Sequence, residues 1–351
     1  MFNSIQDTIH LAKNTFVILG KNKEALKPTF AQIKIGLGLY LLFLIGIIAV
    51  FFTDIAAKFF IIIELVMIFF IMIIVFPFIK IYYRAAQSWI VFNTFAGKNI
   101  SYKEGLDRAG RNKGDIITLG ILDFIFTALS SSLKRGTGRG GLFALLNIIL
   151  FILGKAIEEG WDLVGNYLLP ASIVQNKSVM EALPELKNIK NNVPGALVGV
   201  FGVDFVGDAL RSFILFMILI FVAIGIAIGF YLGTWIPLIL IILLVLPINL
   251  IMNVLIEMVK TVYFTLFFTA IVMPMKISPE YRKEVTQYLQ NQENSGNSKQ
   301  TPEEKLNMLV TYVEQYRRQG YSDNEIKTFL ASSGWPADIV NKALIKTKKG
   351  G

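Results

Sequence analysis

The stretch Ile35–Phe52, which reads IGLGLYLLFLIGIIAVFF, decides the fold class of this chain. It carries no charged side chain, and its length is within the range that a helix needs to cross the ~30 Å hydrocarbon layer of a bilayer. A second apolar stretch, 59–79, follows after a short loop that contains Asp54 and Lys58. We therefore expect two transmembrane helices that form a tight hairpin.

The composition agrees with a membrane protein. Of the 351 residues, 54% are hydrophobic and 17% are charged, whereas soluble domains are about half apolar and a quarter charged. The net charge of +9 suits an anionic lipid surface or a nucleic acid, and the apolar stretches favour the lipid bilayer over nucleic acid. The absence of cysteine and the single histidine, His10, exclude disulfides, cysteine zinc sites, catalytic thiols and histidine metal clusters. We expect no cofactor and no metal.

The helical pattern of the second apolar stretch continues beyond the length that one bilayer crossing needs. Pro77 lies near its end, and the pattern beyond it stays helical but mixes aromatic with basic residues. We expect this helix to kink at the proline, leave the bilayer and end at Gly97. Two shorter apolar stretches follow, 116–129 and 142–154. They form either two crossings or a re-entrant hairpin, and the helical pattern that continues through 161–169 favours crossing.

The last apolar blocks complete the predicted bundle. Residues 213–232 form one span, and the block 235–273 is too long for a single crossing, so we expect it to kink and emerge from the bilayer. About six spans place both termini on the same side. The excess of lysine and arginine before residue 35 and over 80–115 predicts that this side is the cytoplasm. The expected location is the cytoplasmic membrane.

Four segments of different composition divide the chain. Residues 1–34 read as an amphipathic helix over 3–19 and a lead-in, with the helix either on the membrane surface or packed on the protein's own spans. Residues 35–275 form the helical membrane domain. Residues 276–300 hold a helix start and a polar linker, and 301–347 read as a cytosolic three-helix module. The fold class is all-α, a polytopic membrane bundle with a small soluble module.

The boundaries of the module follow from capping signals. Thr301 precedes Pro302 and reads as a cap followed by proline at the first helical position, and Ser322 caps a second short helix. Gly320 ends the first helix, and Pro336 opens the third. The predicted core consists of Leu306, Leu309, Tyr312, Val313, Ile326, Phe329, Leu330, Trp335, Ile339, Val340 and Leu344.

Three stretches together resemble an uncharacterised family of prokaryotic membrane proteins with about six spans. They are Ile9–Lys23, Phe95–Lys98 followed by Tyr102–Ala109, and Trp161–Pro170 followed by Ser178–Leu183. This resemblance implies a multi-pass helical fold and supplies no catalytic residues. The tail, with Gln319–Ile326 and Gly334–Pro336, is similar to a helical module found on prokaryotic membrane proteins and to ubiquitin-associated folds. That likeness implies a protein partner for residues 301–347.

Four carboxylates lie within or beside apolar segments: Glu64, Asp123, Asp204 and Asp208. Ionisable groups are costly in lipid, so each is a candidate functional residue. Val206-Gly-Asp208 resembles part of an intramembrane aspartyl protease signature, but Phe205 stands where that signature has a second glycine. Pairing of Asp208 with Arg211, three residues on, is the simpler interpretation.

Charged residues near the helix ends suggest two further sites. Glu158 and Asp162 share a helical face, so they bind a cation or form a solvated turn. Glu257 and Lys260 are spaced to pair on one helix. The glycine-rich loop from 134 to 141 lacks a P-loop ending. Its cations are candidate lipid-headgroup contacts or part of a plain connector: Lys134, Arg135 and Arg139.

Gly225, Gly229 and Gly233 form a strip of small residues along one helix. Such a strip lets another helix approach closely, either within the chain or in a homo-oligomer. Taken together, these features favour a non-enzymatic scaffold or adaptor that engages lipid and recruits a partner through its tail. The alternative is a small transporter or channel that uses the buried carboxylates.

Overall fold

The computed structural model describes residues 17, 19–135, 141–186, 193–234, 236–278, 281, 302–318, 320–332 and 335–348. Helices make up all the regular structure in these residues, which confirms the all-α prediction. The chain divides into two compact units, Met1–Val272 and Met273–Gly351. The amphipathic helix predicted over 3–19 lies outside the described residues, apart from positions 17 and 19.

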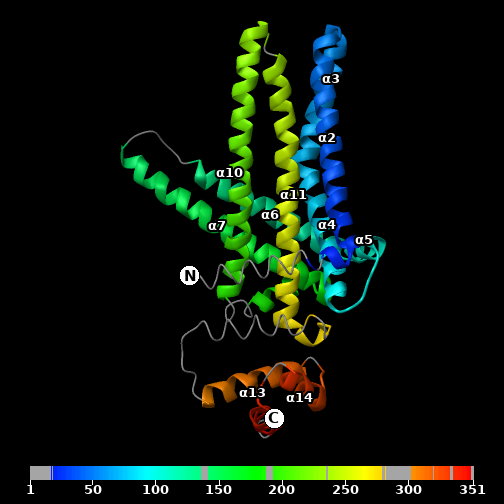
Figure 1. Ribbon diagram of the computed structural model, residues 1–351, viewed down its shortest axis with the longest axis vertical. Coiled ribbons are helices and arrows are strands. Elements are labelled where there is room, and N and C mark those ends of the chain that lie inside the picture. The colour runs from blue at the N-terminus through cyan, green and yellow to red at the C-terminus, as the bar shows by residue number, and fades with distance from the viewer. Residues whose placement is uncertain are drawn as a thin grey trace. The chain divides into compact units, whose positions relative to one another are not determined.

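The first unit contains twelve described helical elements (Figure 1). They are η1 (Lys23–Leu26), α2 (Lys27–Phe52), α3 (Ile55–Phe70), η2 (Ile71–Val75), α4 (Phe76–Phe95), α5 (Tyr102–Arg111), α6 (Lys113–Lys134), α7 (Gly141–Gln175), α8 (Val179–Ala182), η3 (Leu183–Glu185), α10 (Val193–Leu232) and α11 (Ile236–Val272).

Five described helices are long and apolar enough to cross a membrane, which supports the assignment of a membrane protein. They are Lys23–Val50, Ala57–Phe95, Lys113–Lys134, Arg211–Tyr231 and Pro247–Ala270. Figure 1 shows that α2 and α3 form one long hairpin and that α10 and α11 form another. Large apolar side chains on α2, α3 and α10 are exposed, as expected for surfaces that face lipid.

Helices α6 and α7 form a third hairpin. Lys134, at the end of α6, pairs with Glu158 of α7, whereas Asp115, at the start of α6, accepts the N–H of Val179 just after α7 (3.1 Å). The two helices therefore run antiparallel. The predicted helical continuity through 161–169 is confirmed, because α7 is unbroken from Gly141 to Gln175.

The predicted kink near Pro77 takes the form of a π-helical segment. The residues of η2 precede the proline, and the N–H of Phe76 bonds to the carbonyl of Ile71, five residues earlier. Proline has no N–H to donate and crowds the preceding turn, and a widened turn relieves that crowding. Beyond it α4 runs to Phe95 and ends with Gly97 at φ 78°, as the sequence predicted.

The core of the first unit lies where α4, α7 and α11 pack together in their C-terminal halves. Its largest fully buried side chains are Tyr167, Tyr263, Phe264, Phe268, Ile90, Leu168 and Ile173. Buried hydroxyls join the helices, since Thr265 of α11 donates to Ser88 Oγ of α4 at 2.9 Å. Gln87 reaches back to the carbonyl of Ala25 (2.9 Å). This core holds the polar side chains of the site described below in fixed positions.

The second unit contains η4 (Pro274–Lys276), α13 (Pro302–Arg318), α14 (Asp323–Ser332) and α15 (Ala337–Lys348). The predicted cap at Ser322 is confirmed, because its N–H donates to the Glu325 carboxylate at 2.8 Å. Gly320 has a φ of 88°. One core prediction was wrong: Tyr312 is exposed, and Tyr316, one turn later, is buried instead. Burial raises the pKa of the Tyr316 hydroxyl.

Candidate functional site

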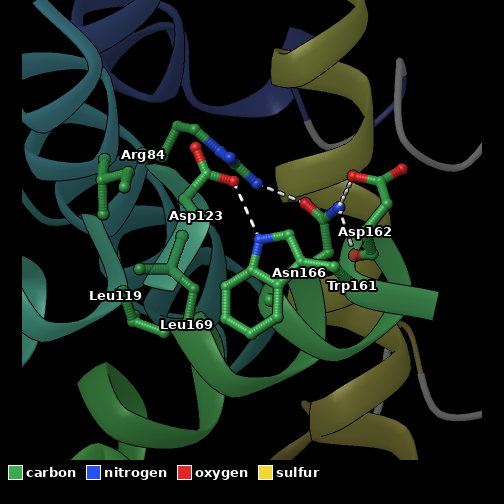
Figure 2. Close-up of a pocket in the computed structure, with 9 residues that line it drawn as sticks. Arg84, Leu119, Asp123, Trp161, Asp162, Asn166 and Leu169 are labelled. Atoms are coloured by element: carbon green, nitrogen blue, oxygen red, sulfur yellow. Dashed lines mark hydrogen bonds between the residues drawn. The ribbon is translucent and has the colours of Figure 1, made fainter. Parts of the chain in front are cut away.

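A small pocket lies between α4, α6 and α7 (Figure 2). Charged, aromatic and apolar side chains line this pocket. Its lining residues are Ile81 and Arg84 of α4, Leu119 and Asp123 of α6, and Trp161, Asp162, Gly165, Asn166 and Leu169 of α7. Helix α11 lies behind the pocket and supplies partners to its charged groups.

Arg84 occupies the centre of this polar cluster. Its guanidinium lies 2.9 Å from the Glu257 carboxylate and donates to the Thr261 hydroxyl, also at 2.9 Å. A third nitrogen donates to the side-chain oxygen of Asn166. The side chain is 15% exposed. Charge-assisted hydrogen bonds of this kind satisfy a cation that has been removed from water, so Arg84 holds α4, α7 and α11 together.

Asp162 forms a second ion pair across helices. Its carboxylate lies 2.5 Å from Lys260 Nζ, whose side chain is 8% exposed. Asn166 donates to the other Asp162 oxygen at 2.7 Å, one helical turn away on α7. Glu257 and Lys260, which were predicted to pair with each other, thus each form an ion pair with another helix. Both pairs link α11 to the rest of the bundle.

Asp123 is bound differently from the other charged groups of the pocket. Its carboxylate accepts a hydrogen bond from Trp161 Nε1 at 2.9 Å (Figure 2). The indole stacks on Phe126, with ring centroids 4.5 Å apart and planes at 12°. Among the described residues no cation lies within ion-pair distance of this carboxylate. Asp123 is therefore the pocket acid whose charge is not balanced by a direct partner.

This arrangement offers one carboxylate, oriented by a neutral donor, as a candidate contact for a small cation. An acidic side chain between apolar helices is a candidate functional residue. The neutral indole N–H orients Asp123 without neutralising it. No group of three or more acidic or histidine side chains that suits a metal ion is present in the described part of the chain.

Of the other predicted carboxylates, only Glu64 has a described side chain, and it does not line the pocket. Glu64 is exposed on α3. Asp204 and Asp208 belong to α10, but their side chains lie outside the described residues. Arg211, the predicted partner of Asp208, donates to Asn253 of α11 at 2.7 Å.

Two of the three predicted lipid-headgroup cations, Lys134 and Arg135, lie in the described part of the chain. Lys134 is held by Glu158, which also lies 3.4 Å from Lys155. Arg135 is exposed at the end of α6, and Arg139 lies outside the described residues. The pairing of Glu158 with two lysines identifies it as part of an ion-pair network between α6 and α7.

The three glycines of the predicted packing strip have two different roles. Gly225 and Gly229 are buried within the membrane unit, and a Cβ on Gly229 would lie 2.9 Å from the carbonyl oxygen of Thr234. Gly233 has a φ of 66° and ends the helix, with Thr234 N–H bonded to the Gly229 carbonyl at 3.0 Å. This is a left-handed helix cap, so Gly233 turns the chain towards α11.

Sequence reasoning did not identify Arg84, Trp161 or Asn166 as site residues. Arg84 belongs to a helix segment rich in mixed aromatic and basic residues, where a single arginine does not stand out. Its acidic partner, Glu257, lies on the last helix of the unit. The i, i+4 spacing of Asp162 and Asn166 was the one local signal of a shared polar face.

Comparison with known proteins found no matching family model, no matching curated protein and no matching solved structure. The proposals below therefore rest on the residues and contacts described above.

Proposed function

We propose that this chain is a non-enzymatic scaffold of the cytoplasmic membrane that engages lipid and recruits a protein partner through its C-terminal helices. The observation that carries this proposal is the separate core of α13, α14 and α15. Leu309, Val313, Ile326 and Val340 of these helices are fully buried against one another. A unit with its own core, tethered to membrane helices by a polar linker, supports a role in presenting a binding surface.

The proposed topology has six crossings with both termini in the cytoplasm. In this arrangement α7 is the sixth span beside the five apolar helices, which is consistent with its antiparallel packing on α6. A cysteine placed at Thr137 tests the topology cleanly, because the chain has no cysteine of its own. Six crossings predict labelling by an impermeant thiol reagent in intact cells, whereas a Thr328→Cys control is labelled only after lysis. Labelling of both positions only after lysis would contradict six crossings and support a re-entrant hairpin.

Deletion of the module tests the scaffold role directly. Proximity labelling from the full chain is compared with labelling from a chain that ends at residue 300, at matched membrane abundance. A third variant, Tyr312→Ala with Ile345→Ser, changes two exposed side chains and leaves the core intact. We expect both variants to lose the same neighbouring protein. An unchanged set of labelled neighbours in the truncated chain would contradict the proposal.

A small cation transporter or channel is the second candidate, and the observation that favours it is Asp123. This carboxylate lines the pocket and has a neutral partner, Trp161, in place of a cation. The test is proton and monovalent-cation flux in vesicles that contain the purified full chain. Asp123→Asn should abolish flux, and Asp54→Asn, at an exposed position before α3, should retain it. Equal flux from empty vesicles would contradict this candidate.

A further inference from the structure

The short helix η1 and the first turns of α2 have two different faces. One face packs on α4, where the Gln87 amide donates to the Ala25 carbonyl at 2.9 Å and to the Thr29 hydroxyl at 3.1 Å. The opposite face is exposed, and its side chains recur at the three- and four-residue spacing of one helical side. These residues, called the basic face below, are Lys23, Lys27, Phe30 and Lys34.

The basic face continues into the apolar outer side of α2. Beyond Lys34 the same side of the helix carries Leu41, Ile45 and Ile48, which are 53%, 60% and 45% exposed. Lipid covers exposed apolar side chains of a helix that crosses a bilayer. The headgroups of that lipid therefore lie where the apolar stretch of α2 begins. Helical side chains lean towards the N-terminus, so the Lys34 ammonium group is directed from the edge of the hydrocarbon towards these headgroups.

The charge of the basic face is complementary to an anionic headgroup. Glu24 is the single acid in the sequence from residue 23 to residue 34. Its carboxylate pairs with Lys27 and accepts the N–H of Tyr102, at the start of α5, at 2.8 Å. The three lysines of the basic face thus outnumber the acid. Lysines at the end of a span are attracted to the phosphate groups of an anionic leaflet.

We propose that the basic face binds the headgroup phosphates of anionic phospholipids. Phe30 is 55% exposed, and its ring fits the boundary between headgroups and acyl chains, with lysines one turn away on either side. The inference rests on the lipid engagement proposed above and gives it a site and a lipid class. It moves the headgroup contact from the predicted Lys134, which is held by Glu158, to the start of the first span.

Quenching of a fluorescent label by brominated lipid tests this contact in vesicles that contain the purified full chain. Because the chain has no cysteine, the label is placed at Leu41→Cys or, as the matched control, at Ile48→Cys. These positions lie about 10 Å and about 21 Å beyond Lys34 along the helix, in the near and far halves of a ~30 Å layer. The vesicles hold equal amounts of phosphatidylglycerol and phosphatidylcholine, and one of the two carries bromine on its acyl chains.

The label at Leu41 should be quenched several-fold more by brominated phosphatidylglycerol than by brominated phosphatidylcholine. The label at Ile48 should be quenched equally by both lipids. Equal quenching by both lipids at Leu41, or the same preference at both positions, would overturn the proposal. Quenching by both lipids at Ile48 and by neither at Leu41 would show that a protein covers the face, which would also overturn it.

The role of the lysines is tested with two matched pairs of substitutions in the Leu41→Cys chain. Lys23→Gln with Lys34→Gln removes two exposed cations of the basic face, and Lys327→Gln with Lys342→Gln removes two exposed cations of the second unit. Glutamine is close to lysine in helix propensity, and thermal stability shows that each chain is folded. The first pair should lose the preference for phosphatidylglycerol and the second should keep it. An unchanged preference in the first pair would contradict the assignment.

Salt provides a test that needs no lysine variant. Raising the salt concentration from about 0.1 M to about 1 M shortens the Debye length from ~10 Å to ~3 Å, so the preference at Leu41 should fall several-fold. A preference that does not change with salt would contradict a contact with phosphate. Failure of this inference is distinct from failure of the scaffold role, because the loss of labelled neighbours on truncation at residue 300 is measured independently of the lipid at Leu41.

Discussion

Arg84 of α4 and Glu257 of α11 form an ion pair at 2.9 Å within the membrane unit. The pair joins the helix that follows the first hairpin to the last helix of the unit. Lys80, one turn before Arg84, lies 4.0 Å from the same carboxylate. Asp162 and Lys260 make the neighbouring bridge. These two bridges fix the relative rotation of α4, α7 and α11, and so they determine which side chains line the pocket.

Removal of one partner of the Arg84 ion pair should destabilise the protein strongly. Arg84→Leu leaves the Glu257 carboxylate without its closest cation, and loss of one partner of a buried pair typically costs about 3–5 kcal/mol. The variant pair Arg84→Leu with Glu257→Leu should recover most of that loss, because both charges of the pair are removed and only Lys80, which is 28% exposed, loses a partner. Thermal unfolding in detergent gives the comparison. A double variant that is less stable than Arg84→Leu would contradict this account.

Two glycines in neighbouring helices should respond in opposite ways to alanine. A Cβ on Gly105 of α5 would lie 2.8 Å from the Ile90 side chain and 3.0 Å from the Ala86 carbonyl oxygen, whereas a Cβ on Gly114 of α6 meets nothing within 4 Å. Gly105→Ala should lower the melting temperature, because backbone cannot move aside easily. Gly114→Ala should raise stability by up to ~1 kcal/mol through helix propensity. Similar effects of both changes would argue against the close α4–α5 packing.

The core of the C-terminal helices should be sensitive at Leu309 and tolerant at Ile345. Leu309 is fully buried and Ile345 is 58% exposed. Leu309→Ala should cost about 2–5 kcal/mol, and Ile345→Ala should stay within about 0.5 kcal/mol. Hydrogen exchange of α13 and α15 amides in the full chain measures both effects locally. Equal exchange rates in the two variants would contradict the described core.

The cap of α14 should depend on pH. Hydrogen bonds from the Ser322 backbone and hydroxyl lower the pKa of Glu325 below its ordinary value. Because the folded-state pKa is the lower one, the cap contributes its full stability above the unfolded-state value, ~4.3, and loses it as the pH falls through the folded-state value. An NMR titration of Glu325 measures this pKa, and Ser322→Ala should raise it. An unchanged titration in that variant would show that the Ser322 hydroxyl does not contribute and that the backbone N–H, which the variant keeps, accounts for the shift.

The local features of this protein could be predicted from the sequence. The apolar stretch Ile35–Phe52 identified a helix that is long and apolar enough to cross a membrane, and Ser322 marked a helix start whose capping hydrogen bonds are present. Gly97 and Gly320 marked two helix ends, and both have positive φ angles. Each of these features depends on residues within about one helical turn, so the sequence alone carries the information.

The polar pocket was decided by tertiary structure alone. Arg84 was one basic residue among several on an amphipathic helix, and its partners lie on other helices. Glu257 and Lys260 were spaced to pair locally, yet each forms an ion pair across the bundle. In the second unit, the helical pattern placed Tyr312 in the core, whereas Tyr316, one turn later, is the buried residue. The physical reason is that periodicity identifies a helical face only coarsely, whereas the rotation of packed helices selects which polar groups meet.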